Sequence, residues 1–383
     1  MTKLKLKDCC TIIAGQSPES KYYNTEGDGL PFFQGKADFG ELYPTVRVYC
    51  SQPTKIAEKD DILLSVRAPV GPTNLSPGRV CIGRGLTAIR PSKELNLKFL
   101  LFFFKYFEAQ LQQQGTGTTF KAITQVVIKN LEVPIPPLTE QQRIVACIEE
   151  LFSQLDSGVE TLRKTKQQLA VYRQAVLKEA FAGCEEVCSM GSIATMIDPQ
   201  PSHRTPPEFE NGISYIGIGD IDYTEKRINL ESARKVNPSV LEDHLARYTL
   251  HDGDFVMGKI GTIGKPFRLP IPQNYALSAN VILIQPNSKK IIPEYLFWQF
   301  SSPLVTEQLM EGKNETSQPA FGIQKARLLQ IKTCNFEKQK QIVQDIESKL
   351  SVCDSIEQTV DAALQQAEAL RQSVLKQAFE GEL

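Results

Sequence analysis

The sequence of 383 residues lacks the features that mark secreted and membrane-spanning proteins. No apolar stretch approaches the roughly 20 residues that span a bilayer, and the N-terminal MTKLKLKDCC has no apolar core for a signal peptide. The nine cysteines are odd in number, scattered and without a CxxC pair. We therefore expect a cytoplasmic protein with reduced cysteines.

Metal and catalytic motifs are also absent from the sequence. GTIGKP (261–266) lacks the glycine spacing of a phosphate loop, and Pro266 stands where that loop requires Ser or Thr. TPPEF (205–209) lacks the Asn or Asp and the aromatic residue of an amino-methyltransferase motif. No metal-ligand spacing joins the three histidines, which are predicted to be surface residues: His203, His244 and His251. The sequence predicts a chain that is not an enzyme and holds no metal or cofactor.

The charge is nearly balanced and does not by itself indicate a nucleic-acid binder. The net charge is −1, with 17 basic and 12 acidic side chains in residues 1–138 and 15 and 18 in residues 184–337. A protein that binds duplex DNA usually presents a basic face. Such a function would require locally clustered basic residues, or a partner that supplies the phosphate contacts.

What the sequence does contain is a long internal repeat. RQAVLKEAFAG (173–183) returns 198 residues later as RQSVLKQAFEG (371–381), with eight of eleven positions identical. At the same offset, IVACIEELFSQLD (144–156) corresponds to IVQDIESKLSVCD (342–354). The repeat therefore spans about 45 residues in each copy.

Weaker similarity continues upstream in the same order. DILLSVRAPVG (61–71) matches DFVMGKIGTIG (254–264), and LPFFQGKADF (30–39) resembles ISYIGIGDID (213–222). Both pairs read as a buried strand followed by a glycine-containing loop. The ordered matches indicate that the chain arose by duplication of a domain followed by a helix.

Each strong copy of the repeat has apolar residues alternately four and three apart, which is the pattern of a coiled coil. A helix from Thr139 to Phe181 would be about 64 Å long at ~1.5 Å per residue. Thr139 with Gln142 forms a capping-box pair at its start, and Gly183 and Gly381 suit the ends of the two helices. The predicted seam consists of Ile144, Ile148, Leu151, Leu155, Leu162, Leu169, Tyr172 and Val176, and of Ile342, Ile346, Ile356, Val360, Leu370 and Val374.

These patterns predict a mixed α/β fold with an approximate two-fold axis. Two homologous α/β domains, residues 1–138 and 184–337, would be separated by two long helices, residues 139–183 and 338–383. The helices would pair as an antiparallel coiled coil, which is also a common dimerisation or spacer element.

Residues 131–183, from LEVPIPPLTEQQR to AVLKEAFAG, closely resemble the central helical region of the specificity subunits of type I restriction–modification enzymes. TTFKAIT (118–124) and GQSPES (15–20) also match that family. The C-terminal copy departs from it, because Cys334-Asn335-Phe336 replaces Pro136-Pro137-Leu138. The resemblance extends over the chain in its domain–helix–domain–helix order.

The resemblance implies that each domain is a target-recognition domain that reads one half of a bipartite site in double-stranded DNA. It also implies that the helices fix the gap between the halves and dock two methyltransferase subunits. Restriction and translocase subunits would complete the complex. S-adenosylmethionine and ATP are then expected on these partners, with no cofactor on this chain.

Base readout requires side chains with hydrogen-bond donors and acceptors on loops that reach a groove. Three loops in each domain fit this description. In the first domain the candidates are Gln34, Lys36, Arg67, Arg79, Arg84, Thr116, Thr118, Thr119 and Lys121. In the second domain they are Lys259, Lys265, Arg268, Asn314, Ser317, Gln318, Gln324 and Lys325, with Asp220 and Asp222 near the position of Gln34. Ordinary solvated loops would contain the same residue types.

Two other functions fit parts of the sequence. A non-catalytic coiled-coil scaffold with two ligand-binding domains and no role on DNA would show the same repeat. A self-contained methyltransferase would have to bind S-adenosylmethionine by itself, which we do not expect. The aromatic run FLLFFFKYF (99–107) could stack on bases, but its helical spacing favours a place in the core.

Overall fold

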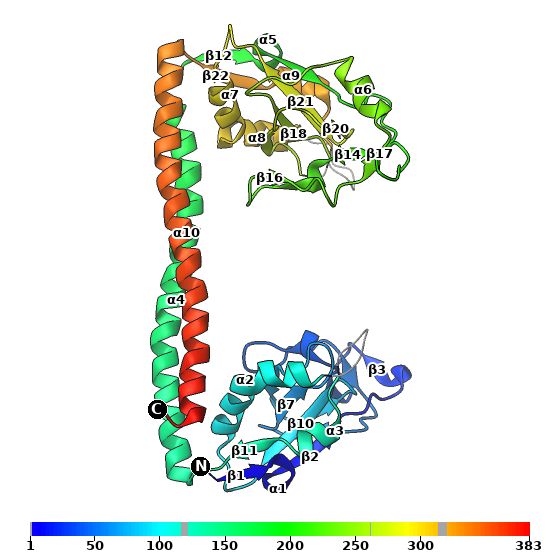
Figure 1. The fold of residues 1–383 in the computed structure, drawn as a ribbon, viewed down its shortest axis with the longest axis vertical. Coiled ribbons are helices and arrows are strands. Elements are labelled where there is room, and N and C mark those ends of the chain that lie inside the picture. The colour runs from blue at the N-terminus through cyan, green and yellow to red at the C-terminus, as the bar shows by residue number, and fades with distance from the viewer. Residues whose placement is uncertain (1, 116–121, 261, 313–319) are drawn as a thin grey trace. The chain divides into compact units, whose positions relative to one another are not determined.

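The computed structural model describes residues 2–115, 122–260, 262–312 and 320–383. The chain divides into two compact units: unit 1 contains residues 1–163 and 361–383, and unit 2 contains residues 164–360. Each unit has one α/β domain and parts of both long helices, α4 (Leu138–Ala180) and α10 (Phe336–Glu380) (Figure 1). Within the described residues, no helix is both long and apolar enough to cross a membrane.

The domain of unit 1 is built on three small sheets. The main sheet is antiparallel, in the order β2 (Cys10–Ala14), β10 (Leu86–Pro91), β7 (Ile62–Ser65), β8 (Thr73–Leu75). The second sheet has the order β3 (Tyr23–Asn24), β5 (Tyr49–Cys50), β4 (Leu30–Phe33), β9 (Val80–Ile82), β6 (Ile56–Ala57). A short ladder joins β1 (Lys3–Lys5) to β11 (Glu132–Pro134), and the domain helices are α1 (Leu6–Cys9), α2 (Leu97–Gln114) and α3 (Gln125–Lys129).

The aromatic run 99–107 lies in α2 and forms core rather than a stacking surface, as its spacing predicted. Phe99 and Phe103 are buried, and their rings lie 5.1 Å and 5.6 Å from that of Phe379 on α10. The side chain of Asn96 caps α2 by accepting a hydrogen bond from the backbone of Phe99. The aromatic face of α2 therefore attaches the domain of unit 1 to the long helix.

The domain of unit 2 repeats this plan. Its main sheet has the order β13 (Ala194–Ile197), β21 (Val281–Pro286), β18 (Phe255–Gly258), β19 (Pro266–Arg268), which corresponds strand for strand to the main sheet of unit 1. The remaining strands are β12 (Glu186–Ser189) with β22 (Gln330–Thr333), β17 (Lys235–Val236), β14 (Ile213–Ile216) and β20 (Tyr275–Leu277), and β15 (Ile221–Asp222) with β16 (Arg227–Ile228). The parallel pairs β4–β9 and β14–β20 also correspond. The shared order agrees with the duplication inferred from the sequence.

The helices of unit 2 differ in two respects: residues 239–245 form a helix without a counterpart among the described helices of unit 1, and two helices stand in place of α2. The helices of unit 2 are α5 (Met190–Ile193), α6 (Ser239–Leu245), α7 (Pro293–Phe300), α8 (Pro303–Glu311) and α9 (Ile323–Leu328). Where unit 1 has the single helix α2, unit 2 has α7 and α8, because Pro303 lacks the N–H that would continue α7 and starts a new helix instead.

The two long helices lie side by side in each unit and run antiparallel (Figure 1). In unit 1, Arg371 of α10 forms an ion pair with Asp156 of α4. In unit 2, Arg173 of α4 contacts Asp354 at 2.7 Å and Glu357 at 3.0 Å on α10. Apolar residues near these pairs join the core clusters of the two domains. The mixed α/β fold with two long helices is thus confirmed, whereas the coiled-coil geometry and the domain boundaries stay predictions.

The predicted seam is only partly buried. Ile144, Ile148, Leu169, Val176, Ile342, Ile346 and Val360 are buried, and Leu151, Leu155, Leu162 and Val374 are partly buried. The prediction of a seam position is wrong for Tyr172, Ile356 and Leu370, because these residues are 48%, 40% and 46% exposed. The residues that follow Tyr172 and Leu370 turn inward instead: the side chains of Arg173 and Arg371 are 24% and 23% exposed, and each forms an ion pair between the helices. Glu357, which follows Ile356, also forms such a pair but is 38% exposed. Charge pairing therefore accounts for two of these positions, which a purely apolar pattern assigned one residue too early.

A buried glutamine ties each long helix to its domain. Gln141 of α4 accepts a hydrogen bond from the backbone N of Asn96 at 2.7 Å and donates to the carbonyls of Glu94 and Pro136. In unit 2, 198 residues later, Gln339 of α10 accepts from Ile292 N at 2.9 Å and donates to the carbonyl of Cys334 at 2.7 Å. Both side chains are at most 1% exposed. Each amide joins the first turn of a long helix to the start of a domain helix.

Replacing Gln141 or Gln339 by Leu should lower the free energy of unfolding by about 1–3 kcal/mol, because buried backbone groups lose their partners. Thermal or urea denaturation of each variant measures this loss. The control is Gln142→Leu, which changes an exposed neighbour of Gln141 on the same helix turn. Equal stability of Gln141→Leu and Gln142→Leu would contradict a structural role for the buried amide.

The surface position predicted for His244 is wrong, since this residue of α6 is 1% exposed. Its ring nitrogens lie 3.1 Å from Gln200 Oε1 and 3.2 Å from the Tyr248 hydroxyl, so both are satisfied within the fold. Burial lowers the pKa of His244 to about 4, and Arg247 acts in the same direction while Asp243 opposes it. The side chains of His203 and His251 are exposed, as expected.

The depressed pKa of His244 predicts loss of stability in acid. The unfolded chain, with a histidine pKa near 6.5, takes up the proton before the folded chain does. The free energy of unfolding should therefore be unaffected by this group above pH ~6.5 and fall by up to roughly 3 kcal/mol as the pH drops toward ~4. Denaturation between pH 4 and 8 tests this, and His244→Gln should flatten the profile. An unchanged profile in that variant would assign the acid sensitivity elsewhere.

Candidate nucleic-acid interface

A hollow of about 760 Å³ lies in the domain of unit 1. It is formed where β4 ends, where β7 passes into its following loop, and between β9 and β10. Four of the residues predicted to contact DNA line it together: Gln34, Lys36, Arg67 and Arg84. Other lining residues that the sequence analysis missed are Ser17, Tyr23, Phe32, Asp38 and Arg47. No sequence motif identifies Arg47 as a lining residue. It lies just before β5, and the pairing of β5 with β4 brings it to the hollow.

Close approach of two strands shapes the floor of this hollow. A Cβ atom at Gly85 would lie 2.1 Å from the carbonyl oxygen of Gln34, so only glycine fits there. In unit 2 the glycine and the amide residue have changed places: Gly217 follows β14, and Asn280 precedes β21. A Cβ at Gly217 would lie 2.9 Å from the Asn280 amide. The glycine and the amide-bearing residue are therefore exchanged between the two positions, Gln34 with Gly85 in unit 1 and Gly217 with Asn280 in unit 2. Of these, Gln34, Gly85 and Asn280 line the hollows.

The hollow of unit 1 is basic. Four basic side chains and one acidic side chain line it: Lys36, Arg47, Arg67, Arg84 and Asp38. Arg47 is held by Asp38 at 2.6 Å. Within the part of the chain that the structure describes, the guanidinium groups of Arg67 and Arg84 form neither an ion pair nor a hydrogen bond. These two groups are thus available to an external acceptor.

The corresponding hollow in unit 2 has a volume of about 770 Å³ and contains three predicted residues, Lys259, Gln324 and Lys325. Its charges are engaged internally: Lys259 contacts Asp198 at 2.8 Å, and Lys325 donates to the carbonyl of Gly312. The hydroxyl of Tyr215, a side chain that is only 5% exposed, also lines it and has no hydrogen-bond partner among the described residues.

Several predicted residues lie outside these hollows. Arg79 pairs with Glu58 at 3.5 Å, Lys265 lies over the ring of Tyr223, and Arg268 lies over the ring of Phe297. Asp220 and Asp222 accept hydrogen bonds from nearby backbone N–H groups and stabilise turns. A further group lies outside the described residues: Thr116, Thr118, Thr119, Lys121, Asn314, Ser317 and Gln318.

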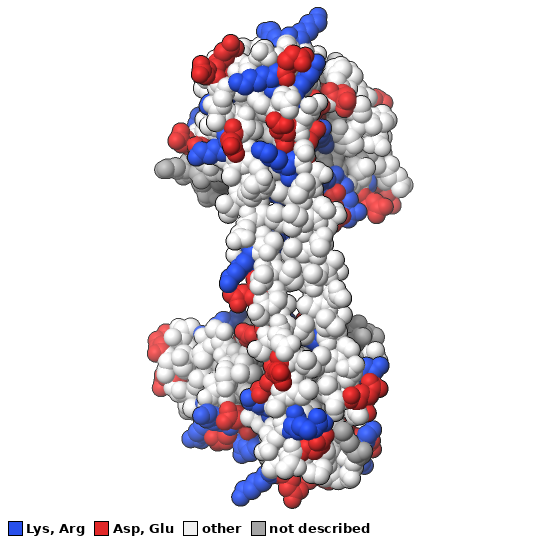
Figure 2. All heavy atoms as spheres, turned by 90° about the vertical axis from the view of Figure 1, so that its left-hand side faces the viewer, with Lys and Arg blue, Asp and Glu red and all other residues white. Residues whose placement is uncertain are grey.

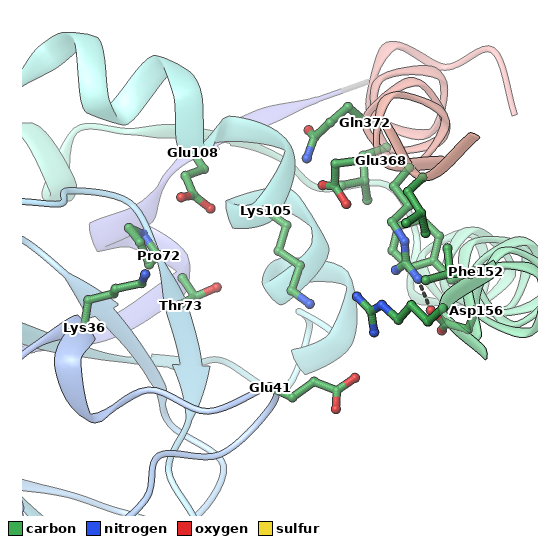
Figure 3. Close-up of a pocket in the computed structure, with 15 residues that line it drawn as sticks. Lys36, Glu41, Pro72, Thr73, Lys105, Glu108, Phe152, Asp156, Glu368 and Gln372 are labelled. Carbon is green, nitrogen blue, oxygen red and sulfur yellow. Dashed lines mark hydrogen bonds and ion pairs between the residues drawn. The ribbon is translucent and has the colours of Figure 1, made fainter. Parts of the chain in front are cut away.

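A third cavity, of about 620 Å³, lies within unit 1 between the domain and the long helices (Figure 3). Burial lowers the pKa of Lys105 and raises that of Glu108, both of which are on α2. Figure 3 shows Lys105 and Glu41 on the domain side, facing Asp156 and Glu368 of the long helices. The lining has four basic and four acidic side chains, so the cavity has no net attraction for phosphate: Lys36, Lys105, Arg163, Arg371, Glu41, Glu108, Asp156 and Glu368.

The face shown in Figure 2 has no large patch of charges of one sign. On the face shown in Figure 2, basic and acidic side chains are interspersed on both units. Among the described residues, no group of three or more His, Cys, Asp or Glu side chains could hold a metal ion. The basic hollow of unit 1 is therefore a local feature, which agrees with the small positive balance of residues 1–138.

Comparisons with known proteins agree with the resemblance found in the sequence. Residues 1–170 match the model of the type I restriction modification DNA specificity domain. The putative type I restriction enzyme MjaX specificity subunit of Methanocaldococcus jannaschii is 40% identical over 173 residues, or 45% of this chain and 40% of that subunit. The type I restriction enzyme EcoKI specificity subunit of Escherichia coli strain K12 is 25% identical over 376 residues, or 91% of this chain and 80% of that subunit.

Among solved structures, the HsdS subunit from Thermoanaerobacter tengcongensis is 49% identical over 40% of this chain and 37% of that chain, with a TM-score of 0.37. The match to the MjaX subunit likewise spans less than half of that relative's length. The sequence matches confirm the resemblance to type I specificity subunits, most strongly for the first domain and the start of α4.

The glycine at the floor of the first hollow gives a direct test of its geometry. Gly85→Ala should lower the free energy of unfolding by about 1–3 kcal/mol, because the new methyl group collides with the Gln34 carbonyl. Gly78→Ala is the matched control, since nothing lies within 4 Å of a Cβ placed there. Thermal denaturation compares the two variants, and equal melting temperatures would show that the strands at the hollow are not closely packed.

Proposed function

We propose that this chain is the DNA specificity subunit of a type I restriction–modification complex and that it reads a bipartite site in double-stranded DNA. The observation that carries the proposal is the presence of two homologous domains whose hollows occupy equivalent positions but have different linings. Equivalent folds with different contact residues suit two half-sites of different sequence. The similarity to specificity subunits, by family model and over 91% of the chain to one relative, supports it.

The chemistry of the two hollows supports a nucleic-acid ligand. The hollow of unit 1 offers free guanidinium groups, an amide and the stacked rings of Tyr23 and Phe32. Arginine and amide side chains are the groups that read base edges, and arginine also contacts phosphate. In unit 2 the amide side chain of Gln324, which also lines the hollow, is a group of the same kind.

In this proposal the chain has no catalytic role and acts with partners. Two methyltransferase subunits dock on the long helices, and restriction and translocase subunits complete the complex. S-adenosylmethionine and ATP are bound by those partners, and the complex works in the cytoplasm. The nearly neutral surface of this chain fits such an assembly, since partner subunits can close around the DNA and supply the phosphate contacts that it lacks.

The proposal predicts that this chain determines where its partner methyltransferase acts. Mapping of methylated adenines across a genome, with and without the gene for this chain, should reveal a split motif that disappears on deletion. Reintroduction of the chain should restore the same motif. Persistence of the motif after deletion would contradict the proposal.

The competing function is a scaffold with two ligand-binding domains and no role on DNA. The reconstituted complex with the methyltransferase should bind one duplex sequence preferentially, with an affinity that falls as salt rises. Absence of a preferred sequence at every salt concentration would favour the scaffold. S-adenosylmethionine binding by the isolated chain would favour a self-contained methyltransferase instead.

A further inference from the structure

The backbone hydrogen bonds allow the two hollows to be compared position by position. In unit 1 the backbone N of Val66 donates to the carbonyl of Gly85, and Ile123 N donates to the carbonyl of Val66. In unit 2 the same two bonds run from Lys259 N to Asn280 O and from Phe321 N to Lys259 O. Val66 is therefore equivalent to Lys259, and Gly85 to Asn280.

These equivalences identify the residues of unit 2 that correspond to Arg67 and Arg84. Arg67 follows Val66 and forms an isolated bridge with Ala122, just as Ile260 follows Lys259 and bridges to Ala320. Arg84 precedes Gly85, as Ala279 precedes Asn280. Both members of each pair line the hollow of their own unit. At two equivalent lining positions, unit 1 thus has arginines where unit 2 has aliphatic side chains.

We propose that Arg67 and Arg84 are specificity-determining residues that read guanine in the half-site bound by unit 1. The inference rests on the proposed function and deepens it by naming the base. The planar fork of arginine matches the O6 and N7 acceptors of guanine in the major groove, and this is the commonest specific arginine contact. Ile260 and Ala279 have no donors, so unit 2 does not select guanine at the corresponding positions and offers apolar contact of the kind that suits a thymine methyl group.

Three observations favour base reading by this pair. Two other arginines of the domain are engaged, Arg47 of the hollow with Asp38 at 2.6 Å and Arg90 with Asp61 at 2.7 Å. Arg67 and Arg84 are exposed and project from the two strands that the Val66–Gly85 hydrogen bond joins, so they lie together. Their backbone is anchored on both sides, which limits the entropy lost when the side chains bind.

The test uses the complex of this chain with its partner methyltransferase. A double variant, Arg67→Ile with Arg84→Ala, gives unit 1 the residues of unit 2 at both positions. Methylation is measured on a duplex library in which every base of the target is varied. The preference for a base is the ratio of methylation of two sequences in one sample, so it does not depend on the fraction of the complex that is active. The variant should lose about 5- to 150-fold of the preference for guanine at each contacted position in one half-site. The preferences in the other half-site should stay unchanged.

The control is Lys98→Ala, which removes a basic side chain of the same domain that is paired with Glu149 at 2.5 Å and lies outside the hollow. It should leave every base preference intact. Denaturation of both variants checks folding; because the guanidinium groups of Arg67 and Arg84 form no ion pair or hydrogen bond among the described residues, the double variant should melt with the wild type.

Two results would overturn the inference while leaving the proposed function standing. One is an unchanged guanine preference in the double variant. The other is equal weakening on all sequences with a smaller salt dependence, which would identify the arginines as phosphate contacts. Absence of any sequence preference in the wild-type complex would instead contradict the proposed function itself.

Discussion

The buried amides of Gln141 and Gln339 are the contacts on which the arrangement of each domain and its long helix depends. Each one satisfies backbone groups at the start of the helix and at the start of a domain helix, in a place from which water is excluded. An amide buried in this way carries a large penalty if its partners move, so it fixes one arrangement. Aromatic contacts such as that of Phe99 with Phe379 then bury apolar surface in an arrangement that the hydrogen bonds already specify.

Residues that line a binding hollow need a rigid frame, and close packing beside each hollow supplies one. In unit 1, Gly85 lies so close to the Gln34 carbonyl that only glycine fits, and in unit 2, Gly217 packs against the side-chain amide of Asn280. The frame is shared, while the side chains that line it differ. Duplication followed by divergence at lining positions gives one chain two hollows with the same backbone hydrogen bonds and different side chains.

Much of the fold could be predicted from the sequence, because repeats and apolar periodicity report directly on packing. The duplication, both long helices and the core role of residues 99–107 follow from such patterns. Tyr172 and Leu370 were misplaced because Arg173 and Arg371 turn inward to form ion pairs, and periodicity does not register charge pairing across helices. The buried position of His244 was missed because its partners Gln200 and Tyr248 come together only in the folded domain.

The sequence predicted which loops form the candidate site, but not which residues of those loops line it. Gln34, Lys36, Arg67 and Arg84 do line one hollow, but Lys265 and Arg268 lie against aromatic rings elsewhere. Residue type alone does not show whether a basic side chain is free or engaged, and that distinction separates Arg67 from Arg79. The equivalence of Arg67 and Ile260 already follows from the match of residues 61–71 with 254–264, whereas that of Arg84 and Ala279 came from the backbone hydrogen bonds.

The central claim is that each domain independently reads one half of a DNA site. The most direct measurement is the methylation motif produced by a chain in which residues 186–333 are replaced by a second copy of residues 3–134, the equivalent segment between paired end strands. The account predicts a target whose two halves are inverted copies of one sequence. An unchanged asymmetric target, produced by a chimera that still assembles with the methyltransferase, would contradict it.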